Sequence, residues 1–311
     1  MASIMGKVVN RFMRTMTMNP LINKNQLKTL NRVNKLTWYK VPKGYEQKKF
    51  VVDELPMEII RKKDSESKNV IYILHGGAYV SKLSSLYRLH AKGYSKAGYD
   101  ASVIYIDYRV APENKYPAAL EDAIKGWDWI LSQGYKEENI IVIGDSAGGH
   151  LTLSLMLKLR EQKRTMPKAA ICLSPWADMT SSADTYYKNY NKDILLGNKK
   201  GEFNDEIRDM LSNSDMYSFC HGMDLYDPYI SPVYADYNDF PPMLLIAGGN
   251  EMVAGDSQII AEKLTNAGSE VTLEITPDMF HVFPLYSMII PEAKRAMKMI
   301  HSFMAKHLSN N

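Results

Sequence analysis

A serine stands between two glycines at residues 144–148 (GDSAG), directly after the apolar run 140–143 and before an apolar helical pattern that begins at Leu151. Strand, sharp turn and helix form the context in which a Gly-x-Ser-x-Gly segment exposes a nucleophilic hydroxyl. The glycines carry no Cβ atom, so the strand and the helix can approach closely around the serine. We predict that Ser146 is a nucleophile; the motif alone also fits an ordinary strand–helix turn.

A second glycine segment lies upstream at residues 75–79 (HGGAY), after the apolar run 70–74. Backbone N–H groups in such a segment can face a substrate oxygen without obstruction by side chains. We expect an oxyanion hole made by the N–H groups of Gly76 and Gly77, with that of Ala147 after the nucleophile. His75 is expected to orient this loop by hydrogen bonds. The side chains beside these groups are expected to line the substrate pocket: Ala78, Tyr79 and Asp145.

The chain resembles the hormone-sensitive-lipase-like family of α/β-hydrolases, in its bacterial carboxylesterase branch, over roughly residues 65–308. The resemblance rests on the two glycine segments and on four further segments: 107–113 (DYRVAPE), 116–122 (YPAALED), 174–180 (SPWADMT) and 227–232 (DPYISP). It implies an α/β-hydrolase fold, with a mostly parallel central sheet flanked by helices and a helical cap. The family usually has a third glycine at the position of Ala78, a difference that concerns the acyl pocket more than the oxyanion hole.

The resemblance also implies the base of the catalytic triad. His281 lies in the segment 278–283 (DMFHVF), in a loop after the last strand-like run, 271–275. This position matches the catalytic histidine of the family, which follows the nucleophile and the acid in chain order. The other six histidines stand in helical, insert or glycine-loop contexts that indicate packing or exposure.

Two carboxylates compete for the acid position of the triad. The strand-like run 242–248 is followed by a loop that holds Glu251 and ends near Asp256. Aligning Asp256 with a later carboxylate of the family places Glu251 on the catalytic position, and a subgroup of the family uses glutamate there. Asp256 followed by Ser257 is also typical of a helix N-cap, which would explain Asp256 without catalysis. Glu251 is the favoured acid and Asp256 the rival.

These roles predict a serine carboxylesterase that hydrolyses small-molecule esters with short to medium acyl groups through an acyl-enzyme. Two alternatives stay open: a related deacetylase or amidase acting on a sugar acetate or an aryl formamide, and a non-catalytic receptor. Plant gibberellin receptors of this family lack the catalytic histidine, so His281 argues against the receptor. The chain contains no paired Cys-x-x-Cys and no phosphate- or dinucleotide-binding glycine fingerprint, so we expect no cofactor and no metal.

The order of elements supports this fold. Strand-like and helix-like segments alternate from about residue 70 onward, which is typical of a parallel sheet covered on both faces. An early antiparallel hairpin is predicted across residues 50–63. The alternation breaks at residues 179–230, a stretch rich in Tyr and Met. We therefore predict a catalytic domain over residues 46–178 and 231–311, a cap insert at 179–230 and an N-terminal cap segment at 1–45.

Charge is concentrated at the N-terminus. Residues 1–49 carry 11 Lys and Arg against one acid, Glu46, in a chain whose formal net charge is only +3. An apolar stripe at helical spacing, from Met5 to Met16, favours a cap helix with its charged side in water. Weak contact with an anionic membrane surface is the second interpretation. No recognition motif supports nucleic-acid binding.

Two cysteines and the absence of a signal-like apolar run favour a reducing compartment, and we predict a cytoplasmic protein. Cys172 is expected to be buried in a strand. A homodimer through an edge strand or the C-terminal helix is compatible with the sequence, but no residues single out an interface.

Overall fold

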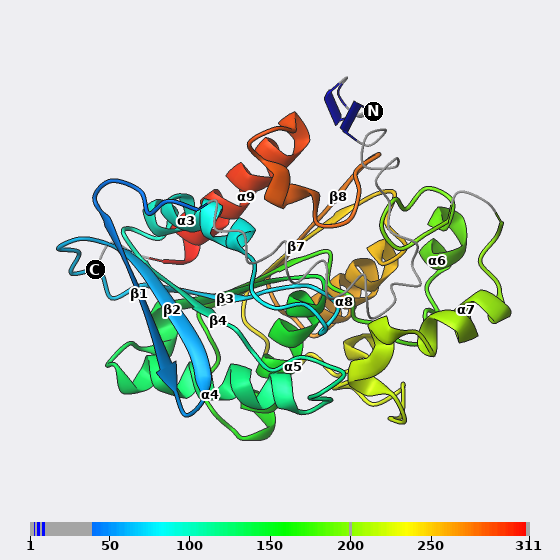
Figure 1. The fold of residues 1–311 in the computed structure, drawn as a ribbon, viewed down its shortest axis with the longest axis horizontal. Helices are drawn as coiled ribbons and strands as arrows, with labels where there is room; N and C mark the ends of the chain where they lie inside the picture. Colours follow the sequence, from blue (N-terminus) through cyan, green and yellow to red (C-terminus); the bar gives the residue numbers. More distant parts are fainter. Residues whose placement is uncertain (1–2, 4, 7, 10–38, 199–200, 309–311) are drawn as a thin grey trace.

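The computed structural model describes residues 3, 5, 6, 8, 9, 39–198 and 201–308. Within them, the chain forms an eight-stranded sheet in the order β1-β2-β4-β3-β5-β6-β7-β8 (Figure 1). The strands are β1 (Tyr45–Val52), β2 (Leu55–Lys62), β3 (Val70–Leu74), β4 (Ser102–Ile106), β5 (Ile140–Asp145), β6 (Ala169–Leu173), β7 (Met243–Gly248) and β8 (Val271–Thr276).

The sheet is antiparallel only at one edge. β1 pairs with β2 as a hairpin, and β2 runs antiparallel to β4, whereas all later neighbours are parallel. The prediction of a mostly parallel sheet with an early antiparallel hairpin is confirmed, although the hairpin begins at Tyr45, before the predicted residues 50–63. The strands β3 to β7 are buried along their whole length, which explains their continuous apolar runs.

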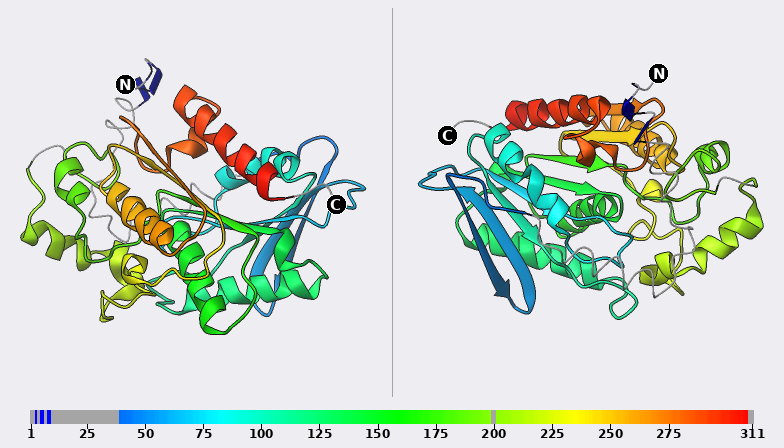
Figure 2. Two further views of the ribbon diagram at one scale, coloured as in Figure 1. Left: turned by 180° about the vertical axis from the view of Figure 1, so that it is seen from behind. Right: turned by 45° about the horizontal axis from the view of Figure 1, so that its top comes forward.

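Helices cover both faces of the sheet (Figures 1 and 2). Val70, Tyr72 and Leu74 of β3 belong to the core on the side of α4 (Ala118–Ser132) and α5 (Ala147–Glu161). Ile71 and Ile73 point the other way, toward α3 (Ala91–Ala97) and α9 (Pro291–His307). The helix α8 (Ala254–Asn266) packs beside α5. This alternation along one strand follows from the two-residue period of a β-strand.

The chain leaves the sheet between β6 and β7. The helices α6 (Asp184–Asn189) and α7 (Asp205–Ser212) and a 3-10 helix, η3 (Asp215–Cys220), lie within residues 179–230, hereafter called the insert. Figure 1 shows α6 and α7 beyond one end of the sheet. The predicted N-terminal cap segment, residues 1–45, falls mostly outside the described residues. In the part of the chain that is described, no helix is long and apolar enough to cross a membrane.

Candidate active site

The turn between β5 and α5 holds Ser146 in a strained conformation. Its φ is 51°, in the left-handed region that L-residues rarely adopt. A Cβ atom on Gly148 would lie 2.0 Å from the carbonyl oxygen of Leu74, and one on Gly144 would lie 2.1 Å from that of Gly148. Side chains are therefore excluded at both glycines. Close packing of strand on helix is what places the Ser146 hydroxyl at this turn.

Three predicted residues from distant parts of the chain meet at this hydroxyl. The Oγ atom of Ser146 lies 2.9 Å from Nε2 of His281, and Nδ1 of His281 lies 2.8 Å from Oε2 of Glu251. Ser146 follows β5, Glu251 follows β7, and His281 follows β8, so the carboxyl ends of parallel strands bring them together. With Nδ1–H donating to the carboxylate, Nε2 is free to accept the serine proton.

His281 is poised to be a base. Burial by itself lowers the pKa of the imidazole, whereas the hydrogen bond from His281 to Glu251 and the charge of Glu251 raise it. Asp193 and Asp145 add smaller contributions of the same sign, so the net shift raises the pKa of His281. A raised pKa makes the ring a stronger proton acceptor when it is neutral.

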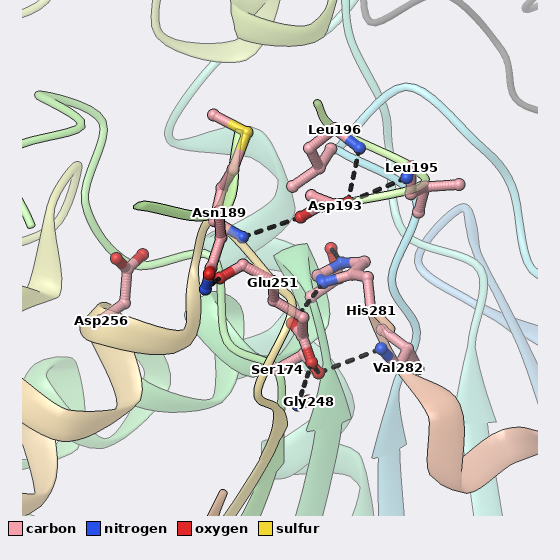
Figure 3. A network of polar contacts seen from close by, with 12 residues as sticks. Ser174, Asn189, Asp193, Leu195, Leu196, Gly248, Glu251, Asp256, His281 and Val282 are labelled. Atoms are coloured by element: carbon pink, nitrogen blue, oxygen red, sulfur yellow. Dashed lines mark hydrogen bonds and ion pairs between the residues drawn. The ribbon is translucent and has the colours of Figure 1, made fainter. Parts of the chain in front are cut away.

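Glu251 is held by donors on its other oxygen. The hydroxyl of Ser174 donates to Oε1 at 2.7 Å, and the N–H of Gly248 donates to the same atom. Ser174 in turn accepts the N–H of Val282 at 3.0 Å, which links the acid to the loop of the base (Figure 3). In the sequence, Ser174 stands out only as part of a family segment. Its position at the end of a buried strand was the available signal.

Asp256 lies apart from Glu251 and His281, on α8 (Figure 3). The helix begins at Ala254, with Val253 as its N-cap, so the interpretation of Asp256 as an N-cap is wrong. Its Oδ2 atom instead accepts the N–H groups of Ala177 and Asp178, at 2.9 and 3.0 Å. Burial raises the pKa of Asp256 well above its ordinary value. Asp256 fixes the segment that follows β6, and Glu251 alone of the two rivals contacts the base.

The expected role of Gly76 in an oxyanion hole is wrong. Its N–H donates to Oδ1 of Asp145 at 2.9 Å and to the hydroxyl of Tyr87 at 2.8 Å. The Tyr87 hydroxyl donates to Oδ2 of the same carboxylate at 3.0 Å. A Cβ atom on Gly76 would lie 2.4 Å from Asp145 Oδ2, so the glycine is needed for the carboxylate to approach. Gly76 therefore anchors the glycine loop, and Tyr87 gave no sequence signal for its part.

The neighbours of Gly76 are better placed as oxyanion donors. Gly77 and Ala78 line the cavity that contains Ser146 and His281. Ala147 is the first residue of α5, and the N–H groups in the first turn of a helix have no acceptor within the helix. Among the described residues, no acceptor takes the N–H of Gly77, Ala78 or Ala147. Gly77 and Ala78 thus have unused donors at the lining of the cavity, and Ala147 has one next to Ser146.

The cavity has a volume of about 270 Å³ and a largely apolar wall. The insert contributes Leu195, Leu196 and Met216 to this wall. Asp145 also lines the cavity, next to Ser146. Burial raises the pKa of Asp145 to about 6, against the hydrogen bonds from Tyr87 and Gly76 that lower it.

Tyr79 does not line this cavity, so its predicted place in the substrate pocket is wrong. Its ring stacks on Phe219, and its hydroxyl pairs with Nδ1 of the buried His150. Burial lowers the pKa of His150 to about 4, so the ring is neutral and donates from Nε2 to the carbonyl of Ile230 at 2.9 Å. Tyr79 ties the glycine loop to the end of the insert.

His75 has the structural environment that the sequence predicted. Its Nδ1 donates to the carbonyl of Gly76 at 2.8 Å, and its ring stacks on Tyr108 with the centroids 4.1 Å apart. Burial lowers the pKa of His75 to about 4, which keeps the ring neutral.

Known proteins share the fold of this chain. Residues 70–285 match a family model described as the alpha/beta hydrolase fold. An acetyl-hydrolase of Streptomyces hygroscopicus is 30% identical over 79% of this chain and 78% of its own length. An esterase of Acinetobacter venetianus is 30% identical over 78% of this chain and 76% of its own.

Solved structures extend the similarity to nearly the whole chain. The crystal structure of EstE5 soaked with p-nitrophenyl butyrate has a TM-score of 0.84 and 29% identity, and covers 98% of this chain and 99% of its own. An esterase from the bacterial hormone-sensitive lipase family has a TM-score of 0.83 and 26% identity, over 99% of this chain and 100% of its own. The chain belongs to the hormone-sensitive-lipase-like carboxylesterases of the α/β-hydrolase fold.

Four residues at the site of this carboxylesterase have a strained backbone. Besides Ser146, positive φ angles occur at Ala78 (52°), Ser174 (48°) and Val282 (56°). Each of these residues borders the cavity or contacts a triad member. Strain of this kind persists only where the surrounding packing imposes it, and it is typical of active sites.

Proposed function

We propose that this carboxylesterase hydrolyses small esters through an acyl-enzyme on Ser146, with His281 as general base and acid and Glu251 as the orienting carboxylate. The hydrogen-bonded chain from Ser146 through His281 to Glu251, at 2.9 and 2.8 Å, carries the proposal. A serine hydroxyl is a weak nucleophile until an adjacent base removes its proton, and this chain supplies that base.

In the first half-reaction, Ser146 Oγ attacks the ester carbonyl carbon while its proton passes to Nε2 of His281. The carbonyl π-bond opens, and the negative charge on its oxygen is held by the N–H groups of Gly77, Ala78 and Ala147. Loss of one such donor raises the barrier by roughly 2.7–4 kcal/mol in related chemistry. The imidazolium is stabilised by Glu251 and then protonates the leaving alcohol as the carbon–oxygen bond breaks.

In the second half-reaction, water attacks the acyl carbon on Ser146. His281 accepts the proton of the water, the oxyanion donors hold the second tetrahedral intermediate, and the proton returns to Ser146 Oγ as the acid leaves. The apolar cavity of about 270 Å³ supports a preference for short to medium acyl groups. The acetyl-hydrolase and the esterase among its relatives act on the same class of bond, by their names.

The test is hydrolysis of p-nitrophenyl esters from acetyl to lauryl by wild type, Ser146→Ala and Glu251→Gln. We expect short-chain activity in wild type, its loss in Ser146→Ala and a strong fall in kcat for Glu251→Gln. Near-wild-type activity of Glu251→Gln would refute the role of the acid. Folded wild type that is inactive on every ester would refute esterase action, and sugar acetates, aryl formamides and ligand binding would then be examined.

A further inference from the structure

Two buried side chains of the insert hold the loop that carries Glu251. Asp193 is 4% exposed and Asn189 is 5% exposed. Oδ2 of Asp193 accepts the N–H of Met252, next to Glu251, at 2.8 Å. The side-chain amide of Asn189 donates to the carbonyl of Glu251 itself at 2.8 Å. The acid loop therefore depends on the insert for its backbone hydrogen bonds.

The same aspartate also shapes the wall of the cavity. Oδ1 of Asp193 accepts the N–H groups of Leu195 and Leu196, at 2.8 and 2.9 Å. Both leucines line the cavity that contains Ser146 and His281. Figure 3 shows Asp193 beside the two leucines, with Asn189 next to Glu251. One carboxylate thus joins the cavity wall to the acid loop.

We infer that Asp193 is a positioning residue that couples the acyl-binding wall to the catalytic acid. An acyl group that presses on Leu195 and Leu196 acts, through the two oxygens of Asp193, on the backbone next to Glu251. The insert therefore selects acyl groups in two ways. One is how well the acyl group fits the cavity, and the other is how well Glu251 and His281 stay aligned when it is bound. The inference rests on the proposed role of Glu251.

The chemistry of a carboxylate explains why aspartate is needed. Both of its oxygens accept hydrogen bonds: Oδ2 from the acid loop and Oδ1 from the cavity wall. An asparagine has one oxygen and one NH₂ group, so its NH₂ donor would face the backbone N–H donors of either the acid loop or the cavity wall. Loss of either side leaves a buried backbone N–H without its partner.

The test compares Asp193→Asn with Asp184→Asn in the full chain. Asp184→Asn is a matched control because it also removes one carboxylate from the insert. The side chain of Asp184 is 82% exposed and pairs with Lys188. For Asp193→Asn we expect kcat on all p-nitrophenyl esters to fall roughly 10-fold. We also expect the ratio of kcat/KM between hexanoate and acetate to fall toward one, because the wall is released.

The pH profile gives the readout that a merely structural role would leave unchanged. The charges that act on His281 are those of Glu251, Asp193 and Asp145, all of which raise its pKa. Removing one of them lowers that pKa, so the acidic midpoint of kcat/KM moves to lower pH in Asp193→Asn. The control keeps the midpoint and the acyl preference of wild type.

Asp193→Glu is the second variant and decides the test if Asp193→Asn does not fold. It keeps the charge but displaces both acceptor oxygens by one methylene group, so we expect a lower kcat and a changed acyl ratio, with a midpoint close to that of wild type. Folded variants that match the control in kcat, midpoint and acyl ratio would overturn the inference. Inactive wild type would instead overturn the proposed function, so the two failures are distinguishable.

Discussion

At the scale of single residues, hydrogen bonds fix the orientation of the catalytic side chains. Glu251 accepts from His281 on one oxygen and from Ser174 and Gly248 on the other. This arrangement leaves the carboxylate fully engaged, so its orientation relative to the imidazole is fixed. Gly76 is engaged in the same way, because its N–H donates to Asp145 and is therefore not available to a substrate oxygen.

The raised pKa of His281 leads to a prediction for the pH dependence of activity. Only neutral His281 accepts the Ser146 proton, so kcat/KM falls as pH drops through a pKa above the ordinary 6.5. Because Glu251 is the main source of the upward shift, Glu251→Gln should move the acidic midpoint to lower pH. Rates measured from pH 5 to pH 9 with p-nitrophenyl acetate check both expectations.

Asp145 titrates near the same range, with a pKa of about 6, so the wild-type midpoint alone does not identify the group. The variant separates the two, because Glu251 contacts His281 and Asp145 contacts the glycine loop. A midpoint that stays in place in Glu251→Gln would contradict the assignment to His281.

At the scale of elements, the contact of β5 with α5 creates the nucleophile turn. Gly148 sits against the carbonyl of Leu74 in β3, so any side chain there pushes the helix away from the sheet. We expect Gly148→Ala to lower the free energy of unfolding by about 3 kcal/mol and to abolish esterase activity. Urea unfolding followed by circular dichroism, together with a p-nitrophenyl acetate assay, measures both.

Gly93→Ala is the control for this prediction. Gly93 lies in α3, and an added Cβ atom there would meet only the tip of the His301 ring, at 3.0 Å. The substitution should be close to neutral in stability, because alanine favours the helix and the neighbouring ring can move. Equal losses of stability in the two variants would argue against the steric explanation.

At the scale of the whole molecule, the cavity is built jointly by the catalytic domain and the insert. Met216, on η3, forms part of its wall and is 6% exposed. Met216→Ala should enlarge the acyl site and raise kcat/KM for octanoate relative to butyrate by roughly threefold or more, since each buried methylene contributes about 0.8 kcal/mol. The chain-length series of p-nitrophenyl esters is the measurement.

Met223→Ala provides the matched control, because Met223 belongs to the same insert but is 40% exposed. It should keep the acyl preference of wild type. If Met216→Ala leaves the ratio of octanoate to butyrate unchanged, the cavity is not the acyl site and the substrate binds elsewhere.

Much of this protein follows from local patterns. Apolar runs four to seven residues long predicted buried parallel strands, since such strands need apolar residues on both faces. The segment around Ser146 predicted the nucleophile turn, because only glycines leave room for the strand and the helix to approach so closely. His281 and the favoured Glu251 came from the resemblance to the family, which places its base and acid in loops after strands. The cytoplasmic location, the dimer and the membrane contact of the N-terminal segment stay predictions.

Only the tertiary structure decided how polar groups are shared between distant segments. Gly76 and Gly77 are equivalent oxyanion donors by sequence, but a carboxylate 69 residues away accepts the N–H of Gly76. Asp256 looked like a helix cap, yet it binds the backbone 78 and 79 residues upstream. The insert's Asp193 carried no signal at all. Backbone geometry is local and can be predicted from residue types, whereas the partner of a hydrogen bond depends on what the fold brings near.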